Sequence, residues 1–200
     1  LVKGGSHLER TAQIDIVAFD KTGTLTAGKP VVTDIVDAAG IHKPDATLPL
    51  HLGILLAEAA ALESKSEHPL AHAIVKSAAA RGLALPEAAD FQSTAGKGAE
   101  ATIAGRRLLI GSERFFRECD ASSMDVIAIA ATPLAQRGKS CVWIGERKGD
   151  LVSALAVLAL ADTLRPEALR TIESLHRLGV KKIVMLTGDQ KAVALSLIHI

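Results

Sequence analysis

The stretch QIDIVAFDKTGTLT, residues 13–26, decides the fold that we predict for this 200-residue chain. Residues 13–19 are mostly apolar and β-branched, which is typical of a strand buried on both faces of a parallel sheet. They run directly into residues 20–26, which combine an acidic residue, hydroxyl groups and a central glycine. Ligands of open parallel sheets bind beyond the carboxyl ends of the strands. We therefore expect an α/β fold with a polar site at Asp20.

A second strand of similar character is predicted at residues 182–186 (KIVML), and it leads into Thr187, Gly188 and Asp189. If the two strands are parallel, both polar ends lie at one edge of the sheet. There Thr187 offers a hydroxyl group, Gly188 permits close approach of the backbone, and Asp189 can orient cationic groups or hydrated Mg²⁺. We interpret this edge as a site for phosphoryl transfer.

The residues between these strands follow a different pattern, which predicts an inserted domain. Its boundaries are expected at residues 30–157, so that residues 1–29 and 158–200 form the other domain. Apolar periodicity, Gly and Pro predict the elements. These are strands at 31–37, 91–94, 98–103, 107–110 and a hairpin of 140–146 with 151–158, and helices at 50–63, 69–80, 113–119 and 124–136, the last distorted by Pro133.

Two further segments join the predicted domains. Residues 27–30 (AGKP) read as a break in the chain and a hinge. Asp162 and Pro166 mark the start of a helix that ends at Gly179.

Composition excludes several classes of protein. Lys and Arg number 23 against 22 Asp and Glu, and aromatic residues make up 2%. This argues against a nucleic-acid partner and against attachment to a membrane by basic residues. Cys119 and Cys141 lack CxxC spacing, so we expect a reduced, intracellular chain. The apolar stretch 151–161 is well short of the ~18 residues that cross a bilayer. Because there is no initiator Met or signal-peptide pattern, we expect a fragment of a longer protein.

Asp20 carries the chemistry expected of the site. A carboxylate at the rim of a buried strand can attack phosphorus and form an aspartyl-phosphate. Backbone N–H groups and hydroxyls of residues 22–24 can bind phosphoryl oxygens, and Lys21 adds a positive charge. Each piece alone is a common turn, but the two polar ends together are much more specific.

Residues 20–26, DKTGTLT, resemble the phosphorylation motif of the P-type ATPases, which belong to the haloacid dehalogenase-like hydrolases. The resemblance covers almost the whole chain. It implies a Rossmann-like phosphorylation domain, incomplete at its C-terminus, interrupted by an α+β nucleotide-binding domain with an antiparallel sheet. It implies that ATP phosphorylates Asp20 and that Mg²⁺ binds the Asp20 carboxylate and the main-chain carbonyl of Thr22. The catalytic residues implied are Asp20, Lys21, Thr22, Thr187, Gly188 and Asp189.

Thr22 separates a pump from a soluble phosphatase. Many soluble relatives carry a second Asp two residues after the nucleophile as general acid and base. A threonine cannot deprotonate water near neutral pH. We therefore expect a long-lived aspartyl-phosphate, which suits a pump that changes shape before hydrolysis.

The string SEHPL, residues 66–70, resembles the His-Pro motif of the heavy-metal-transporting branch. By its residues alone, His68 before Pro69 is more often a helix entrance. His68 and His72 are spaced like two metal ligands, but no third is near. The resemblance implies that His68 orients the nucleotide and that Glu63 lies near the adenine.

Glycines in residues 94–99 (TAGKGA) sit between two predicted strands, where turns and bulges are common. The resemblance implies that Gly96 and Gly98 admit the nucleotide, with Gly111 and Ser112 as a further contact. With so few aromatic residues, we expect the adenine to lie against aliphatic and backbone surface. Lys97 is expected to be solvated, although a phosphate contact stays open. Residues 162–166 resemble the family's second hinge.

Parts of the family pattern are absent from these 200 residues: the Gly-Asp-Gly-x-Asn-Asp motif, the transmembrane helices and the actuator domain. We therefore expect the cytosolic portion of an integral plasma-membrane (inner-membrane) protein, almost inactive alone. Its partners are its own transmembrane and actuator domains, and the transported cation binds elsewhere. Zn, Cd or Pb is favoured over Cu. The alternatives are a soluble phosphatase with an inserted cap and an ATP-binding module inactive in isolation.

Overall fold

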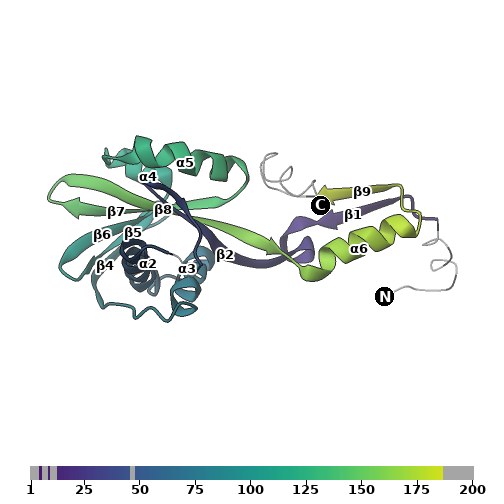
Figure 1. Cartoon of the computed structure of the whole chain (residues 1–200), viewed down its shortest axis with the longest axis horizontal. Coiled ribbons are helices and arrows are strands. Elements are labelled where there is room, and N and C mark those ends of the chain that lie inside the picture. The colour runs from purple at the N-terminus through teal and green to yellow at the C-terminus, as the bar shows by residue number, and fades with distance from the viewer. Residues whose placement is uncertain (1–4, 6–8, 10–12, 46–47, 187–200) are drawn as a thin grey trace. The chain divides into compact units, whose positions relative to one another are not determined.

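The computed structural model describes residues 5, 9, 13–45 and 48–186, apart from the side chains of Lys21 and Thr22, and its elements are drawn in Figure 1. The chain divides into two compact units. The larger unit is Pro30–Ala161, and the smaller one takes its residues from either side, up to Lys29 and from Asp162 onward. The division after Ala161 lies four residues beyond the expected boundary, within a strand.

The smaller unit is built on two parallel strands, β1 (Ile16–Asp20) and β9 (Lys182–Leu186). Their register pairs Ile16 with Lys182 and Asp20 with Leu186. A single π-helical turn, η1 (Lys21–Leu25), follows β1, and helix α6 (Pro166–Arg177) precedes β9. The predicted parallel pairing is therefore confirmed. The expected site residues Thr187, Gly188 and Asp189 lie outside the described residues.

The larger unit contains a seven-stranded sheet in the order β3-β2-β8-β7-β6-β5-β4. Neighbouring strands from β8 through β7, β6 and β5 to β4 pair antiparallel, as do β2 and β3. The strands are β2 (Thr26–Asp37), β3 (Gly40–His42), β4 (Ala88–Thr94), β5 (Gly98–Ile103), β6 (Arg106–Gly111), β7 (Ser140–Lys148) and β8 (Leu151–Leu164). The helices are α2 (Leu50–Glu63), α3 (Pro69–Ala79), α4 (Glu113–Glu118) and α5 (Met124–Gln136). Parallel and antiparallel sheets in one chain confirm the expected fold class.

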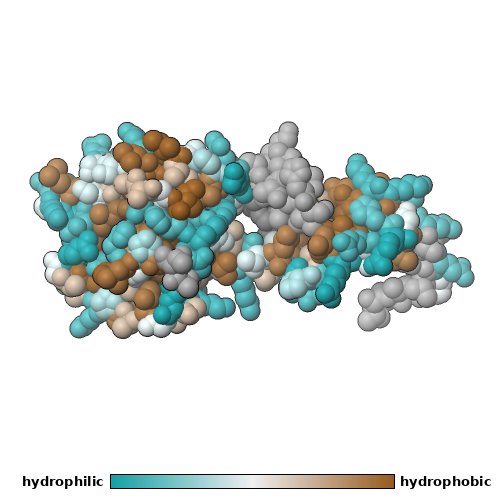
Figure 2. All heavy atoms as spheres, in the orientation of Figure 1, coloured by the Kyte–Doolittle hydropathy of each residue, from teal (hydrophilic) through white to brown (hydrophobic). Residues whose placement is uncertain are grey.

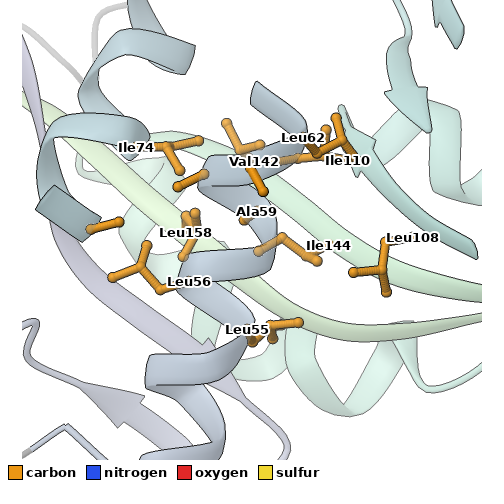
Figure 3. Close-up of a cluster of buried hydrophobic side chains, with 14 of the residues drawn as sticks. Leu55, Leu56, Ala59, Leu62, Ile74, Leu108, Ile110, Val142, Ile144 and Leu158 are labelled. Carbon is orange, nitrogen blue, oxygen red and sulfur yellow. The ribbon is translucent and has the colours of Figure 1, made fainter. Parts of the chain in front are cut away.

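Helices cover both faces of this sheet, and each face has its own apolar core (Figure 1). On one face α2 and α3 pack against alternate side chains of the strands; Figure 3 shows Leu55, Leu56, Ala59 and Leu62 of α2 beside Val142, Ile144 and Leu158. On the other face α4 and α5 bury Phe116, Ile127 and Trp143. Full burial of one large apolar side chain stabilises a fold by about 1.5–3 kcal/mol, so these cores hold the larger unit together.

The outer side of α5 keeps two apolar residues at the surface. Val126 and Ile129 are 53% and 78% exposed, and Figure 2 shows apolar colour over this part of the larger unit. Pro133 lies within α5, which continues to Gln136, so the expected distortion does not end the helix. Among the described residues, no helix has the length and apolar character needed to span a membrane.

Two predictions for the segments where the chain passes from one unit to the other are wrong in part. Residues 27–30, expected as a break, lie inside β2, and Asp162, expected at a helix start, lies inside β8. Helix α6 begins at Pro166, as the sequence predicted. The reason is tertiary: Gly28 adopts a φ of +67°, and its N–H donates a hydrogen bond to the Asp162 carboxylate. A contact across 134 residues thus overrides the local preference of Gly and Pro.

Candidate functional site

A cavity of about 540 Å³ lies in the larger unit. Its volume falls in the range of about 300–1,000 Å³ that is usual for small-molecule sites. Apolar side chains from α3, β4, β5, β6 and β7 line it together with charged residues of the α2–α3 loop. All six residues that the sequence analysis linked to the nucleotide line this cavity: Glu63, His68, Gly96, Gly98, Gly111 and Ser112.

Glu63 is the last residue of α2 and is only partly exposed. Burial raises the pKa of its carboxyl group, and a hydrogen bond with Ser66 offsets part of that rise. Burial disfavours the charged form of this carboxyl group, so a hydrogen bond donated by a ligand would stabilise its carboxylate.

His68 caps the N-terminus of α3, since its Nδ1 accepts a hydrogen bond from the Leu70 N–H at 3.2 Å. Its backbone is extended (φ −70°, ψ 138°), as expected before Pro69. An acceptor at Nδ1 leaves the proton of a neutral imidazole on Nε2, which can donate to a ligand. His68 is thus the N-cap residue of α3, and this role leaves its Nε2 able to contact a ligand.

His72 does not join His68 in a metal site. Its side chain is 66% exposed and lies 3.9 Å from the Glu67 carboxylate. No set of three His, Cys, Asp or Glu side chains suited to a metal ion occurs within residues 13–45 and 48–186.

The glycines lining the cavity have a packing reason that the sequence did not reveal. Gly98 and Gly111 face each other across β5 and β6. A Cβ atom on Gly98 would lie 2.2 Å from the Ile110 carbonyl oxygen, and one on Gly111 would lie 2.5 Å from the Lys97 carbonyl oxygen. Gly96, with a φ of +72°, turns the chain between β4 and β5. The open backbone at this wall is therefore dictated by strand packing as well as by any ligand.

Ser112 caps α4, because its Oγ accepts a hydrogen bond from the Phe115 N–H at 3.2 Å. Its own N–H donates to the Lys97 carbonyl at 3.0 Å, which joins the two loops of this wall. Lys97 was expected to be solvated, but its Nζ lies 2.6 Å from Glu118 Oε2.

Phe91 and Cys141 also line the cavity, and the sequence analysis did not single them out for it. The lining is therefore not purely aliphatic and backbone, because Phe91 adds an aromatic ring; the surface that the adenine contacts stays a prediction. The available signal for Phe91 was its place in a predicted strand just before the glycine turn. Burial, followed by the charge of Glu113, raises the pKa of the Cys141 thiol to about 11. A nucleophilic thiolate is not expected there.

In the smaller unit, Asp20 is exposed at the carboxyl end of β1. The π-helical turn η1 begins with the next residue, and Gly23 within it has a φ of +79°. π-Helical turns are rare in proteins, and those that do occur often lie at functional sites. No hydrogen bond to the Asp20 carboxylate is made by any residue that the structure describes.

Asp162 binds the chain that leaves this turn. Its carboxylate accepts hydrogen bonds from the Thr26 hydroxyl and from the N–H groups of Gly28 (3.1 Å) and Lys29 (3.0 Å). One carboxylate therefore binds three donors within residues 26–29, two of which belong to the segment predicted to be a hinge.

Arg165 binds the turn itself. Its guanidinium group donates to the carbonyl oxygens of Gly23 (2.8 Å) and Thr26 (3.1 Å), and its N–H donates to the Leu25 carbonyl (2.9 Å). We refer to Asp162 and Arg165 as the clasp. Sequence similarity indicated a hinge at residues 162–166, but it did not show that these side chains hold η1.

Comparison with known proteins places this chain. A model of the haloacid dehalogenase-like hydrolase family matches residues 14–200. The chain belongs to the haloacid dehalogenase-like hydrolases. Within that family it is similar to heavy-metal P-type ATPases, as its motifs predicted. A probable copper-exporting P-type ATPase V of Mycobacterium tuberculosis is 40% identical over 194 residues, which are 97% of this chain and 23% of the relative.

Two other members of the group match over almost the whole chain. A probable cadmium-transporting ATPase of Alkalihalophilus pseudofirmus is 39% identical over 198 residues, covering 97% of this chain and 26% of the relative. The crystal structure of a zinc-transporting PIB-type ATPase in an E2.Pi state matches with a TM-score of 0.81 and 38% identity, over 98% of this chain and 29% of that one. The chain thus spans about a quarter of the length of its curated relatives.

Proposed function

We propose that this chain is the catalytic region of an ATP-driven heavy-metal cation exporter, in which the larger unit binds ATP and Asp20 of the smaller unit accepts its γ-phosphoryl group. The observation that supports this most is the cavity that collects Glu63, His68 and the glycine wall. These residues were selected from motifs far apart in the sequence. They nevertheless line one space of suitable volume.

The chemistry of the cavity suits a purine nucleotide. Phe91, Leu70 and Val142 offer apolar surface to the base, and His68 Nε2 and the Glu63 carboxylate offer a donor and an acceptor. Aromatic and aliphatic walls with a few placed polar groups are the usual make-up of such sites. Gly96, Gly98, Gly111 and Ser112 complete the proposed wall.

The chemistry of the smaller unit suits covalent phosphoryl transfer. An Asp20 carboxylate oxygen attacks the γ-phosphorus, the bond from that phosphorus to the bridging oxygen breaks, and ADP leaves as an aspartyl-phosphate forms. Lys21 and the N–H groups of the turn stabilise the phosphoryl charge. We propose that Thr187, Gly188 and Asp189 complete this site. Because Thr22 is no general base, the intermediate persists.

Mg²⁺ fits this proposal, because Asp20 presents an exposed carboxylate and the turn that follows presents backbone carbonyls, both of which are hard oxygen ligands. We assign the Asp20 carboxylate and the Thr22 main-chain carbonyl to the ion. When bound, Mg²⁺ neutralises charge on the transferred phosphoryl group.

Transport requires parts beyond the described residues. We propose transmembrane and actuator domains of the same protein as partners, so that this region is its cytosolic portion at the plasma membrane. The names of the relatives divide between copper and cadmium, and the similar structure belongs to a zinc transporter. Our preference for Zn, Cd or Pb over Cu remains a prediction.

Two variants of His68 test the nucleotide site, and together they separate its cap from its imidazole. Asn is a good N-cap residue and Ala is a poor one. We expect His68→Asn to keep the thermal stability of the chain and to weaken ATP binding. His68→Ala should weaken ATP binding and also lower stability, by about 1 kcal/mol for the lost cap. Calorimetric titration with ATP and thermal melts measure both; unchanged affinity in both variants would mean that His68 is structural only.

A further inference from the structure

Lys97 is held by its backbone and not by its side chain. Its N–H donates to the Thr94 carbonyl at 3.0 Å, and its carbonyl accepts from the Ser112 N–H at 3.0 Å. Glycines flank it on both sides, and the wall they form lines the cavity. The Lys97 Cα therefore has a fixed place at the cavity, while four methylene groups let its ammonium group move.

The partner of Lys97 lies outside the cavity. Its Nζ is 2.6 Å from Glu118 Oε2, and Glu118 is not among the cavity-lining residues. Glu118 Oε1 also accepts from Arg114 Nε at 2.8 Å, so Glu118 keeps a cationic partner if Lys97 leaves. The hydrogen bonds from Lys97 and Arg114 lower the pKa of the Glu118 carboxyl, so it is ionised at neutral pH.

Breaking the Lys97–Glu118 ion pair costs little free energy. The Lys97 and Glu118 side chains are 44% and 35% exposed. Exposed ion pairs contribute little to stability, so an anion of higher charge at the cavity competes well against one carboxylate. The other charged residues of the lining are Glu63, Glu67 and Lys65. Release of Lys97 from Glu118 therefore makes one more positive charge available to an anion in the cavity.

We propose that Lys97 is a specificity-determining residue that binds the polyphosphate of the nucleotide, and that Glu118 competes with the nucleotide for it. Polyphosphate oxygens take Lys97 from Glu118, which then stays with Arg114. This inference rests on the proposed ATP site. Its consequence is that the Lys97–Glu118 pair sets the preference of the site for ATP over the uncharged nucleoside.

Titration calorimetry of the 200-residue chain with ATP and with adenosine tests this. Glu118→Gln frees Lys97 and should tighten ATP binding about threefold, and Lys97→Met should weaken it about fivefold, the size expected of an exposed charge contact. Neither change should alter adenosine binding. In the double variant the gain from Glu118→Gln should vanish. A second lysine of the lining is the matched control: in a Lys65→Met background the gain from Glu118→Gln should survive.

Four results overturn the inference. Equal effects on ATP and adenosine would assign the pair a purely structural role. If the tighter ATP binding of Glu118→Gln persists without Lys97, or vanishes without Lys65, Lys97 is not the lysine that binds the polyphosphate. If the wild-type chain binds both ligands and Lys97→Met leaves both affinities unchanged, this inference alone is overturned. Wild-type chain that binds neither ligand overturns the proposed ATP site along with it.

Discussion

Each of the two units is stabilised internally by a different kind of interaction. The larger unit buries two apolar cores, one on each face of its sheet. In the smaller unit, the described residues that are buried are only Leu25, Thr26, Ala168 and Val180. Its turn is fixed instead by the polar clasp of Asp162 and Arg165. A rigid apolar frame suits a unit that shapes a binding cavity, whereas a polar clasp suits a loop that carries a reacting carboxylate.

The largest effect that we expect separates chemistry in one unit from binding in the other. In a full-length transporter that contains this chain, Asp20→Asn should abolish the acid-stable, hydroxylamine-labile phosphate formed from labelled ATP. ATP affinity of the larger unit should be unchanged, because Asp20 is not among the residues that line its cavity. Covalent phosphate in the variant would mean that another residue is the nucleophile. Rapid turnover of small phosphate esters without an intermediate would favour a soluble phosphatase.

The next effect concerns the contrast in cores. Leu56 of α2 is 1% exposed, and Leu169 of α6 is 45% exposed. Leu56→Ala should destabilise the larger unit by about 2–5 kcal/mol because it opens a cavity in a packed core. Leu169→Ala is the matched substitution in the smaller unit and should change stability by less than about 1 kcal/mol. Urea unfolding followed by far-UV circular dichroism measures both variants, and the fluorescence of Trp143, the single tryptophan, reports the larger unit separately; equal losses in both variants would contradict the contrast.

A smaller effect tests the clasp. Asp162→Ala leaves the Gly28 and Lys29 N–H groups without their carboxylate acceptor. Hydrogen bonds to charged groups contribute about 1.5–3 kcal/mol, so exchange of these two amides should accelerate at least about tenfold. Asp15→Ala, which removes an exposed ion pair with Lys181 in the same unit, is the control and should leave them protected. Slow exchange in the Asp162 variant would show that the clasp is not what fixes the segment.

The smallest effect is a pH dependence at the cavity. Burial raises the pKa of Glu63 above its ordinary value of 4.5. A raised carboxyl pKa means that folding favours the neutral form, so this contribution to stability is present below pH 4.5 and is lost as pH rises through the folded-state pKa. Glu63→Gln should remove that slope. Denaturant midpoints between pH 4 and 8 measure it, with the exposed Glu67→Gln as control, and an unchanged slope in Glu63→Gln would place its origin elsewhere.

Sequence predicted the fold well where local signals agree with tertiary structure. Residues 50–63 form α2 and residues 98–103 form β5 with the expected bounds, because apolar periodicity, Pro49 and Gly98 mark them. The motifs also predicted six residues that line one cavity. Where long-range contacts decide, prediction failed. Asp162 holds residues 28 and 29 within β2, and Phe91, in the irregular stretch of β4 between Ala89 and Gln92, lines the cavity. The Lys97–Glu118 pair joins residues 21 apart on different elements, which no periodicity shows.

The most direct test of the account is a titration of the 200-residue chain with ATP, followed by amide ¹H–¹⁵N spectra. ATP binding at the cavity should give saturable shifts at Gly96, Gly98, Gly111 and Ser112, and at residues 63–68, from the end of α2 to the start of α3. Amides on the far face, around Ile127 and Trp143, should stay in place. Absence of saturable shifts at the cavity, or shifts confined to another part of the larger unit, would contradict it.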